Sequence, residues 1–143
     1  MKISKRIAFI LLLAASAVYP QTWEWVNPKP QGNNLSSVVM NSNTEGFAVG
    51  LLGTIMKTTD MGSNWQVQNV PTKRFLFDIT YSWLNDVFAC GDSGVVVNTW
   101  NLGNNWAVTQ TPVTTPLRGI HFLARDTGFA VGSFGKIVRT TNQ

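Results

Sequence analysis

The sequence predicts an all-β repeat protein in which modules of about 40 residues stack on one another, as in propellers and solenoids. The main observation is a pentapeptide that occurs three times at a spacing of 41 residues, since 91 − 50 = 132 − 91 = 41. The copies are residues 46–50 (GFAVG), 87–91 (VFACG) and 128–132 (GFAVG). Apolar residues also recur with a period of two around each copy, which is typical of strands. The repeat predicts the fold but does not indicate a catalytic or binding function.

Two sets of apolar residues, two positions apart, indicate the first strand of each repeat. These sets are Val38, Ile79 and Ile120, and then Met40, Tyr81 and Phe122. The second strand is the pentapeptide, whose aromatic residue and fourth residue share one face while the central alanine points to the other. We expect the small alanine side chain to let the neighbouring sheet approach closely.

A G-x-x-G spacing follows each second strand and predicts a tight hairpin, because glycine adopts positive φ angles. The third strand then returns over residues 54–58, 95–99 and 136–140. After it comes a turn in which an Asp or Asn side chain caps the backbone, Gly takes an unusual conformation and Trp covers the turn. The two full copies are Thr58, Asp60, Gly62 and Trp65, and Thr99, Asn101, Gly103 and Trp106. Fourth strands are expected at 65–70 and 106–110.

The T-x-D-x-G-x-x-W turn resembles the Asp box of sialidase-type propellers. Combined with the pattern G-F-A-V-G-x-x-G-x-I-x-x-T-T-D, it resembles the repeat of the photosystem II assembly and stability factor family, over residues 35–143. The sequence departs from that pattern where Asn101 and Asn142 replace Asp and where Val87 replaces Gly. The resemblance implies a β-propeller with four-stranded antiparallel blades. It also implies a binding or assembly scaffold without catalytic activity.

The repeats divide the chain into five parts. These are a signal peptide (1–20), an N-terminal strand (21–34), two blade repeats (35–75 and 76–116) and a partial third repeat (117–143). Residues 22–30, which include Trp23 and Trp25, resemble the fourth strand of a blade. Rings typically need four to eight blades, so three predict an incomplete propeller. Either the chain belongs to a longer protein or several copies assemble, because an open arc exposes apolar faces and strand edges.

The first twenty residues are expected to direct export. Lys2, Lys5 and Arg6 precede an apolar run at 7–18, whose 12 residues are too few for a bilayer-spanning helix of about 20. Residues 15–17 (Ala-Ser-Ala) match a small-residue cleavage site. An uncleaved anchor is the alternative. We expect a protein of the periplasm, the cell surface or the extracellular medium, with membrane contact only through this segment.

The charge balance argues against nucleic-acid binding. Three of the 11 basic residues and none of the seven acidic ones lie in the first twenty residues, which leaves a mature net charge of 8 − 7 = +1. A nucleic-acid footprint needs Lys and Arg clustered on one face. The only cysteine, Cys90, stands where the other repeats have Val49 and Val131, so we expect a small buried side chain. A reactive or intermolecular thiol is the alternative.

Few residues point to catalysis. The alternative function, a fragment of a sialidase-like or other carbohydrate-active propeller, would need an arginine cluster and paired carboxylates. Asp78, near Tyr81 and Arg74, is the most enzyme-like group, and a solvated strand-capping charge is the preferred interpretation. His121 is the only histidine, so no metal site is expected, and no cofactor is expected either.

The candidate binding residues are those that depart from the repeat. Lys73 and Arg74 lie between the first two repeats, and Arg118 occupies the corresponding region before the third, so they could gather on one face. Trp83 and Trp100 replace smaller residues of the other repeats, and such tryptophans mark partner surfaces. Solvation and loop packing are the alternative explanations. The expected partner is another protein or an extracellular ligand, with self-association to complete a ring as a further expectation.

Overall fold

The computed structural model describes residues 22–24, 31–83 and 85–142, which form three antiparallel sheets that follow one another along the chain. The first sheet, blade 1, consists of β1 (Leu35–Met40), β2 (Gly46–Gly50), β3 (Ile55–Thr58) and β4 (Gln66–Val67). Blade 2 consists of β5 (Leu76–Trp83), β6 (Asp86–Gly91), β7 (Val95–Thr99) and β8 (Ala107–Gln110). Blade 3 consists of β9 (Leu117–Phe122), β10 (Gly128–Gly132) and β11 (Ile137–Thr140).

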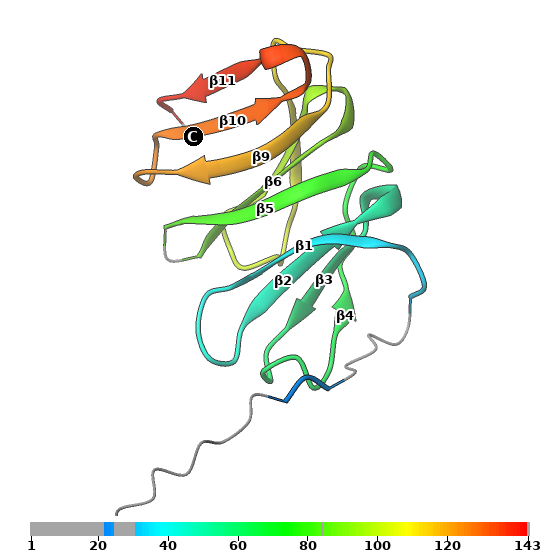
Figure 1. The fold of residues 1–143 in the computed structure, drawn as a ribbon. Helices are drawn as coiled ribbons and strands as arrows, with labels where there is room; N and C mark the ends of the chain where they lie inside the picture. Colours follow the sequence, from blue (N-terminus) through cyan, green and yellow to red (C-terminus); the bar gives the residue numbers. More distant parts are fainter. Residues whose placement is uncertain (1–21, 25–30, 84, 143) are drawn as a thin grey trace, which may run out of the picture.

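The strands of each blade pair in chain order, so each blade is a meander, and blade 2 lies between blades 1 and 3 (Figure 1). The expected strands occur with small differences at their ends. The largest difference is β4, which has two residues, although the Gln68 N–H still donates to the Ile55 carbonyl oxygen at 2.8 Å. The signal peptide and residues 21 and 25–30 of the predicted N-terminal strand lie outside the described residues, and residues 22–24 and 31–34 are not part of a strand.

The register assigns alternate residues to two distinct faces of each blade. We name the face that carries the pentapeptide Phe and its Val or Cys the leading face, and the face that carries Ala the trailing face. On blade 1, Phe47 lies opposite Lys57 and Val49 opposite Ile55, so these four residues share the leading face. The predicted separation of Phe and Val from Ala is therefore confirmed by the packing described next.

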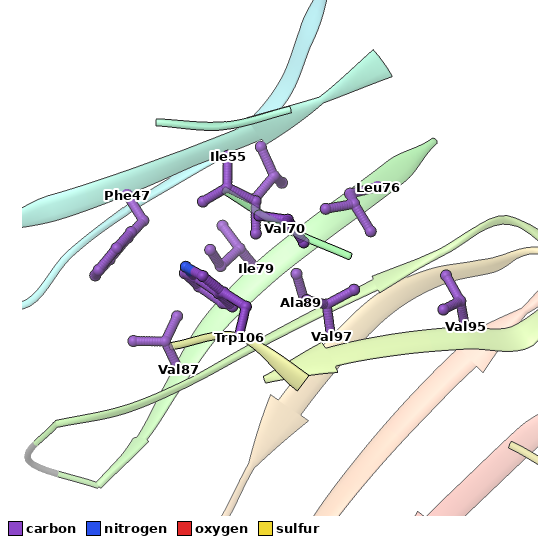
Figure 2. Packing of buried hydrophobic residues seen from close by; sticks show 11 residues of the cluster. Phe47, Ile55, Val70, Leu76, Ile79, Val87, Ala89, Val95, Val97 and Trp106 are labelled. Atoms are coloured by element: carbon purple, nitrogen blue, oxygen red, sulfur yellow. The ribbon is translucent and has the colours of Figure 1, made fainter. Parts of the chain in front are cut away.

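The leading face of each blade packs on the trailing face of the next. Between blades 1 and 2, Phe47 and Val49 are buried against Ile79, Val87 and Ala89 (Figure 2). Between blades 2 and 3, the equivalent residues of the next repeat are buried together. That second cluster contains Phe88, Cys90, Leu117, Ile120, Phe122 and Ala130. The apolar faces between neighbouring blades are thus buried by stacking, as the repeat predicts.

The hairpin between the second and third strands uses its glycines differently from the prediction. Only the second glycine of each pair adopts positive φ, as at Gly53 (70°), whereas Gly50 is extended (−176°). The other positive φ belongs to Leu52 (58°). Gly50 is needed for space instead, because a Cβ there would collide with the Asn34 carbonyl oxygen, which accepts a hydrogen bond from the Leu51 N–H at 2.9 Å.

The T-x-D-x-G-x-x-W turns are closed by hydrogen bonds from side chain to backbone. Thr58 Oγ1 accepts from the Gly62 N–H (2.9 Å), and Asp60 Oδ1 accepts from the Asn64 N–H (2.8 Å). Hydrogen bonds from Asn64 lower the pKa of Asp60. In the second repeat, Asn101 Oδ1 accepts from the Asn105 N–H at 3.0 Å. The amide oxygen therefore takes the place of the carboxylate in this backbone hydrogen bond, so the turn forms with Asn at that position.

Candidate functional site

The first strand of each blade contains a bulge, and the three bulge residues are equivalent by the repeat. The pairing of β1 with β2, of β5 with β6 and of β9 with β10 shifts near the start of each first strand, at Ser36, Phe77 and Arg118, and β5 has a second shift between Tyr81 and Trp83. A bulged residue leaves the ladder and is redirected, a feature found near functional sites. The guanidinium of Arg118 lies over the Phe77 ring, 4.1 Å from its centroid, which is cation–π geometry.

Further aromatic and basic residues surround this contact. The rings of Phe75 and Phe77 are 4.5 Å apart between centroids. Arg74 precedes β5 and donates from Nη1 to Ser93 Oγ at 2.9 Å, while Lys73 is exposed beside it. We call this region the basic–aromatic surface, which consists of Lys73, Arg74, Phe75, Phe77 and Arg118. The predicted basic residues all lie where the first strands begin. The sequence did not point to Phe75, which directly precedes β5, or to Phe77 within β5, because apolar residues are expected in and beside a strand.

Trp83 and Trp100 do not belong to this surface. Trp83 is the last residue of β5 and therefore lies at the opposite end of the strand from Arg74. Trp100 follows β7, and its ring meets the Phe88 ring edge-on, with centroids 5.2 Å apart and planes at 79°. Both side chains are exposed. The five candidate binding residues therefore separate into a basic group at one end of the blades and two tryptophans at the other.

Asp78 is not a solvated charge, contrary to the prediction. Its Oδ1 accepts from Ser37 Oγ at 2.8 Å, and its Oδ2 accepts from the Ile120 N–H at 3.0 Å. The carboxylate therefore joins the first strands of all three blades. The reason is position: Asp78 lies on the leading face of β5, where blade 3 covers it.

The other members of the suspected catalytic group point elsewhere. Tyr81 lies on the trailing face, where it packs against the cluster between blades 1 and 2, and burial raises the pKa of its hydroxyl. Arg74 donates its hydrogen bond to the Ser93 hydroxyl and not to Asp78. Within the described ranges there is no group of three metal-ligating side chains, and His121 is exposed. Nor does any helix among those residues have the length and apolar character to cross a membrane.

Cys90 is fully buried between blades 2 and 3, as expected from its valine counterparts. Its Sγ lies 3.3 Å from the Leu117 carbonyl oxygen, to which the thiol donates. Burial is the main reason why the pKa of the thiol rises to about 12. A neutral, enclosed thiol has little of the thiolate character that reactive cysteines need.

A cleft of about 440 Å³ opens between blades 2 and 3. Its apolar part is lined by Phe88, Val96, Phe122 and Val138. Arg139 of β11 also lines the cleft. The corresponding place between blades 1 and 2 is occupied by Trp106. Sequence reasoning did not single out this cleft, although its signal was present in the Trp of two successive turns at 65 and 106.

No protein-family model and no curated protein sequence matches the chain. Among solved structures, YCF48 bound to D1 peptide matches with a TM-score of 0.69 and 19% identity, covering 79% of this chain and 38% of that one. YCF48 from Cyanidioschyzon merolae matches with a TM-score of 0.71 and 20% identity, covering 80% and 39%. An ancestral GH74 enzyme matches with a TM-score of 0.59 and 17% identity, covering 77% and 18%.

These similarities establish the fold. The chain is an all-β protein whose sheets are blades of a partial β-propeller, and it spans about two-fifths of the YCF48 structures. The expectation of a propeller like that of the photosystem II assembly factors is thereby confirmed at the level of the fold.

Proposed function

We propose that this chain is a β-propeller module that binds another protein and serves as an assembly scaffold without catalysing a reaction. The observation that carries the proposal is the basic–aromatic surface, where Arg118 stacks on Phe77 and Arg74 is held by Ser93. Stacked and hydrogen-bonded arginines are pre-oriented for carboxylates, and neighbouring aromatic rings favour apolar side chains. A structure of the same fold, YCF48, is bound to a peptide.

The chemistry of the surface suggests the class of partner. Three cations and two phenylalanines belong to this surface, and one acidic residue, Asp92, borders it, with its N–H donating to the Phe75 carbonyl oxygen at 2.8 Å. An extended segment that carries acidic residues or a free C-terminal carboxylate together with apolar side chains fits this composition. A small extracellular ligand that carries a carboxylate would fit the same surface.

The enzyme alternative has one supporting observation, the similarity in fold to an ancestral GH74 enzyme. Against it, both oxygens of Asp78 accept hydrogen bonds from protein groups that join the blades. Glycoside hydrolysis needs a pair of carboxyl groups on either side of the bond that breaks. We therefore propose that the chain itself has no glycosidase activity.

Peptide binding tests the proposed function directly. The probe is a fluorescein-labelled ten-residue peptide of alternating glutamate and leucine with a free carboxylate, followed by fluorescence anisotropy at low salt. We expect the double variant Arg74→Ala, Arg118→Ala to bind roughly tenfold more weakly or worse, because charge-assisted hydrogen bonds are lost. The control Arg125→Ala removes a cation from the β9–β10 loop at the other end of the blade. Equal binding by the double variant and the control would contradict the proposal.

We propose further that residues 1–20 are a cleaved signal peptide and that the mature protein is exported. The basic start, the short apolar run and the small residues at 15–17 support this. N-terminal sequencing of the protein from its own host should begin between residues 18 and 22, and a retained Met1 would contradict cleavage.

We also propose that the turns at Thr58 and Thr99 are Asp boxes with a structural role.

A second copy of the chain is the other partner that we propose. The support is the set of apolar side chains that are exposed on the outer faces of the terminal blades, such as Val38 and Val67 on blade 1 and Val131 and Ile137 on blade 3. Two such copies would complete a ring.

A further inference from the structure

Two exposed tryptophans lie at the end of blade 2 that is opposite to the basic–aromatic surface. Trp83 is 56% exposed and Trp100 is 44% exposed. The equivalent residues of blade 1, Ser42 and Thr59, are also exposed, although the four-stranded blade 2 packs against that blade. Exposure is therefore a property of these two positions in a blade. Because blade 1 forms with small polar residues there, the fold does not need the tryptophans.

The strand register brings both tryptophans to one face, on either side of an acidic residue. Trp83 of β5 lies opposite Asp86 of β6, and Asp86 is on the leading face because it stands two residues before Phe88. Trp100 directly follows the residue of β7 that lies opposite Val87, so it comes beside Asp86 from the other strand. We call Trp83, Asp86 and Trp100 the tryptophan row. Its three members come from three neighbouring strands.

Contacts within the protein hold the row in place. The Trp100 ring meets the Phe88 ring edge-on, with centroids 5.2 Å apart. Arg125, from the loop between β9 and β10, pairs through Nε with Asp86 Oδ2 at 3.6 Å. The Asp86 side chain is 8% exposed and the Arg125 side chain 70%, so the carboxylate is enclosed and the guanidinium lies at the surface. Side chains that are already fixed lose less freedom when a ligand binds.

The composition of the row suggests the class of ligand. Indole rings offer flat apolar faces on which the C–H groups of a sugar ring can pack, and a guanidinium donates from a planar fork that suits two adjacent hydroxyl groups. Asp86 and Arg125 neutralise each other and the acidic Asp126 follows, so an anionic ligand is not favoured. A cationic ligand would compete with Arg125 for the carboxylate. A neutral ligand with hydroxyl groups and C–H faces therefore fits best.

The separation of the two tryptophans favours an extended chain of sugars. One strand, β6, lies between β5 and β7, so the two backbones are roughly 10 Å apart at the usual spacing of neighbouring strands. This separation is close to the length of one disaccharide unit. Alternate rings of an extended oligosaccharide would therefore lie on the two indoles, with the ring between them beside Arg125.

We propose that the tryptophan row, together with Arg125, binds an extended neutral oligosaccharide. The sugar faces pack on Trp83 and Trp100, and the hydroxyl groups between them accept hydrogen bonds from the Arg125 guanidinium. The site binds sugar without cleaving it. It lies at the other end of the blades from the basic–aromatic surface, so the chain can hold a glycan and a protein partner at the same time.

Isothermal titration calorimetry of the purified chain with cellohexaose tests the proposal. We expect saturable binding with a dissociation constant of roughly 0.1–1 mM, which is weak because the site is open. Maltohexaose has the same sugar units in a curved chain and should bind at least roughly fivefold more weakly, because its rings cannot lie on both indoles. No saturable binding of cellohexaose, or equal affinity for the two oligosaccharides, would overturn the proposal.

Substitutions in the row provide the second measurement. Trp83→Ala and Trp100→Ala should each raise the dissociation constant by roughly tenfold or more, as at binding sites centred on tryptophan. Trp83→Phe keeps an aromatic face and should raise it by about threefold or less. The control Met61→Ala removes a side chain that is 70% exposed at the same end of blade 1 and should leave binding unchanged. An affinity that neither Trp→Ala variant lowers would contradict the site.

NMR of the unmodified chain locates the ligand without a substitution. Cellohexaose should shift the indole N–H signals of Trp83 and Trp100 and leave that of Trp106, which is enclosed between blades 1 and 2, unchanged. A proline-rich peptide is the comparison, because exposed tryptophans also bind proteins. If the peptide shifts the two signals and cellohexaose does not, the row is a protein-docking surface and the proposal is wrong.

This proposal and the proposed protein-binding function can fail separately. Trp83→Ala and Trp100→Ala should still bind the acidic peptide, and the double variant Arg74→Ala, Arg118→Ala should still bind cellohexaose. Loss of sugar binding with retained peptide binding concerns the tryptophan row alone. The reverse result concerns the basic–aromatic surface alone.

Discussion

The interfaces between blades 1 and 2 and between blades 2 and 3 use equivalent residues, yet they close in different ways. In the first, the Phe47 and Tyr81 rings are 6.2 Å apart and the Phe47 ring meets the edge of Trp106. In the second, the Phe88 and Phe122 rings stack at 4.2 Å beside an open cleft. The strands thus set the spacing of the blades, whereas the tryptophan of the fourth strand determines whether the interface is sealed.

A second difference concerns the polar links across each interface. Lys57 on blade 1 donates from Nζ to the Leu102 carbonyl oxygen of blade 2 at 2.7 Å and pairs with Glu45 at 3.0 Å. Between blades 2 and 3, the Asp78 carboxylate accepts from the Ile120 N–H, the Cys90 thiol donates to the Leu117 carbonyl oxygen, and Arg125 pairs with Asp86 at 3.6 Å. Both interfaces are therefore linked at their first strands, since Ser37 donates to Asp78 across the first one, and the contact of Lys57 with Leu102 is an additional link from β3.

The largest expected effect on stability comes from a substitution that opens the interface between blades 1 and 2. Trp106→Ala should lower the free energy of unfolding by about 3–5 kcal/mol, because a buried aromatic side chain leaves a cavity. Trp100→Ala is the matched change at the open interface, and it should cost about 1 kcal/mol or less because that ring is exposed. Urea unfolding at one fixed protein concentration measures both. Equal losses would mean that Trp106 does not seal the first interface.

Asp78→Ala should have the next largest effect. The change leaves the Ser37 hydroxyl and the Ile120 N–H without their acceptor, at an expected cost of about 1–3 kcal/mol. Asp78→Asn is the matched control, since its amide oxygen can still accept from the Ile120 N–H. The urea midpoint should therefore fall less for Asn than for Ala. If Asp78→Ala is as stable as the parent, the carboxylate does not link the first strands.

Alkaline pH should distinguish the two interfaces through Cys90 and its counterpart Val49. Burial raises the pKa of the Cys90 thiol from 9.0 to about 12. The unfolded chain therefore loses this proton above about pH 9 while the folded chain retains it, so stability is complete below pH 9 and falls as the pH rises further. The expected loss is about 1.4 kcal/mol between pH 8 and 10.

Cys90→Val provides the control for that pH dependence, because valine occupies the equivalent position in the other two repeats. The stability of the variant relative to the parent should increase over the same pH interval. Urea unfolding at pH 8, 9 and 10 measures the difference. Parallel pH profiles for the two proteins would show that the thiol is not enclosed between the blades.

The smallest effect concerns the hairpins at the edge of each interface. Leu52 and Ser93 have positive φ angles of 58° and 57°. Asn tolerates this conformation better than most residues, so Leu52→Asn should stabilise the chain by up to about 1 kcal/mol. Ser93→Asn should gain less, because it also removes the bond to Arg74. Thermal unfolding compares them, and a gain at Ser93 equal to that at Leu52 would count against the Arg74 contact.

Much of the fold follows from the sequence because the repeat is regular. The spacing of 41 residues and the alternation around each pentapeptide predicted the strands and the faces of Phe47 and Ala48. The role of Gly50 was not predictable, since close approach of Asn34 is a contact between distant segments. Asp78 was misjudged for the same reason: its partners come from two other blades. The basic residues could be grouped from the sequence, but the stacking of Arg118 on Phe77 depends on two bulges that leave no local signal.

The cleft between blades 2 and 3 is equivalent to the place that Trp106 fills between blades 1 and 2. A methyl NMR titration of the chain with indole tests this equivalence directly. Indole should shift the methyl signals of Val96 and Val138, which line the cleft, and leave those of Val70 and Val97 beside Trp106 unchanged. Shifts of similar size at all four valines, or no saturable shift at Val96 and Val138, would contradict this equivalence.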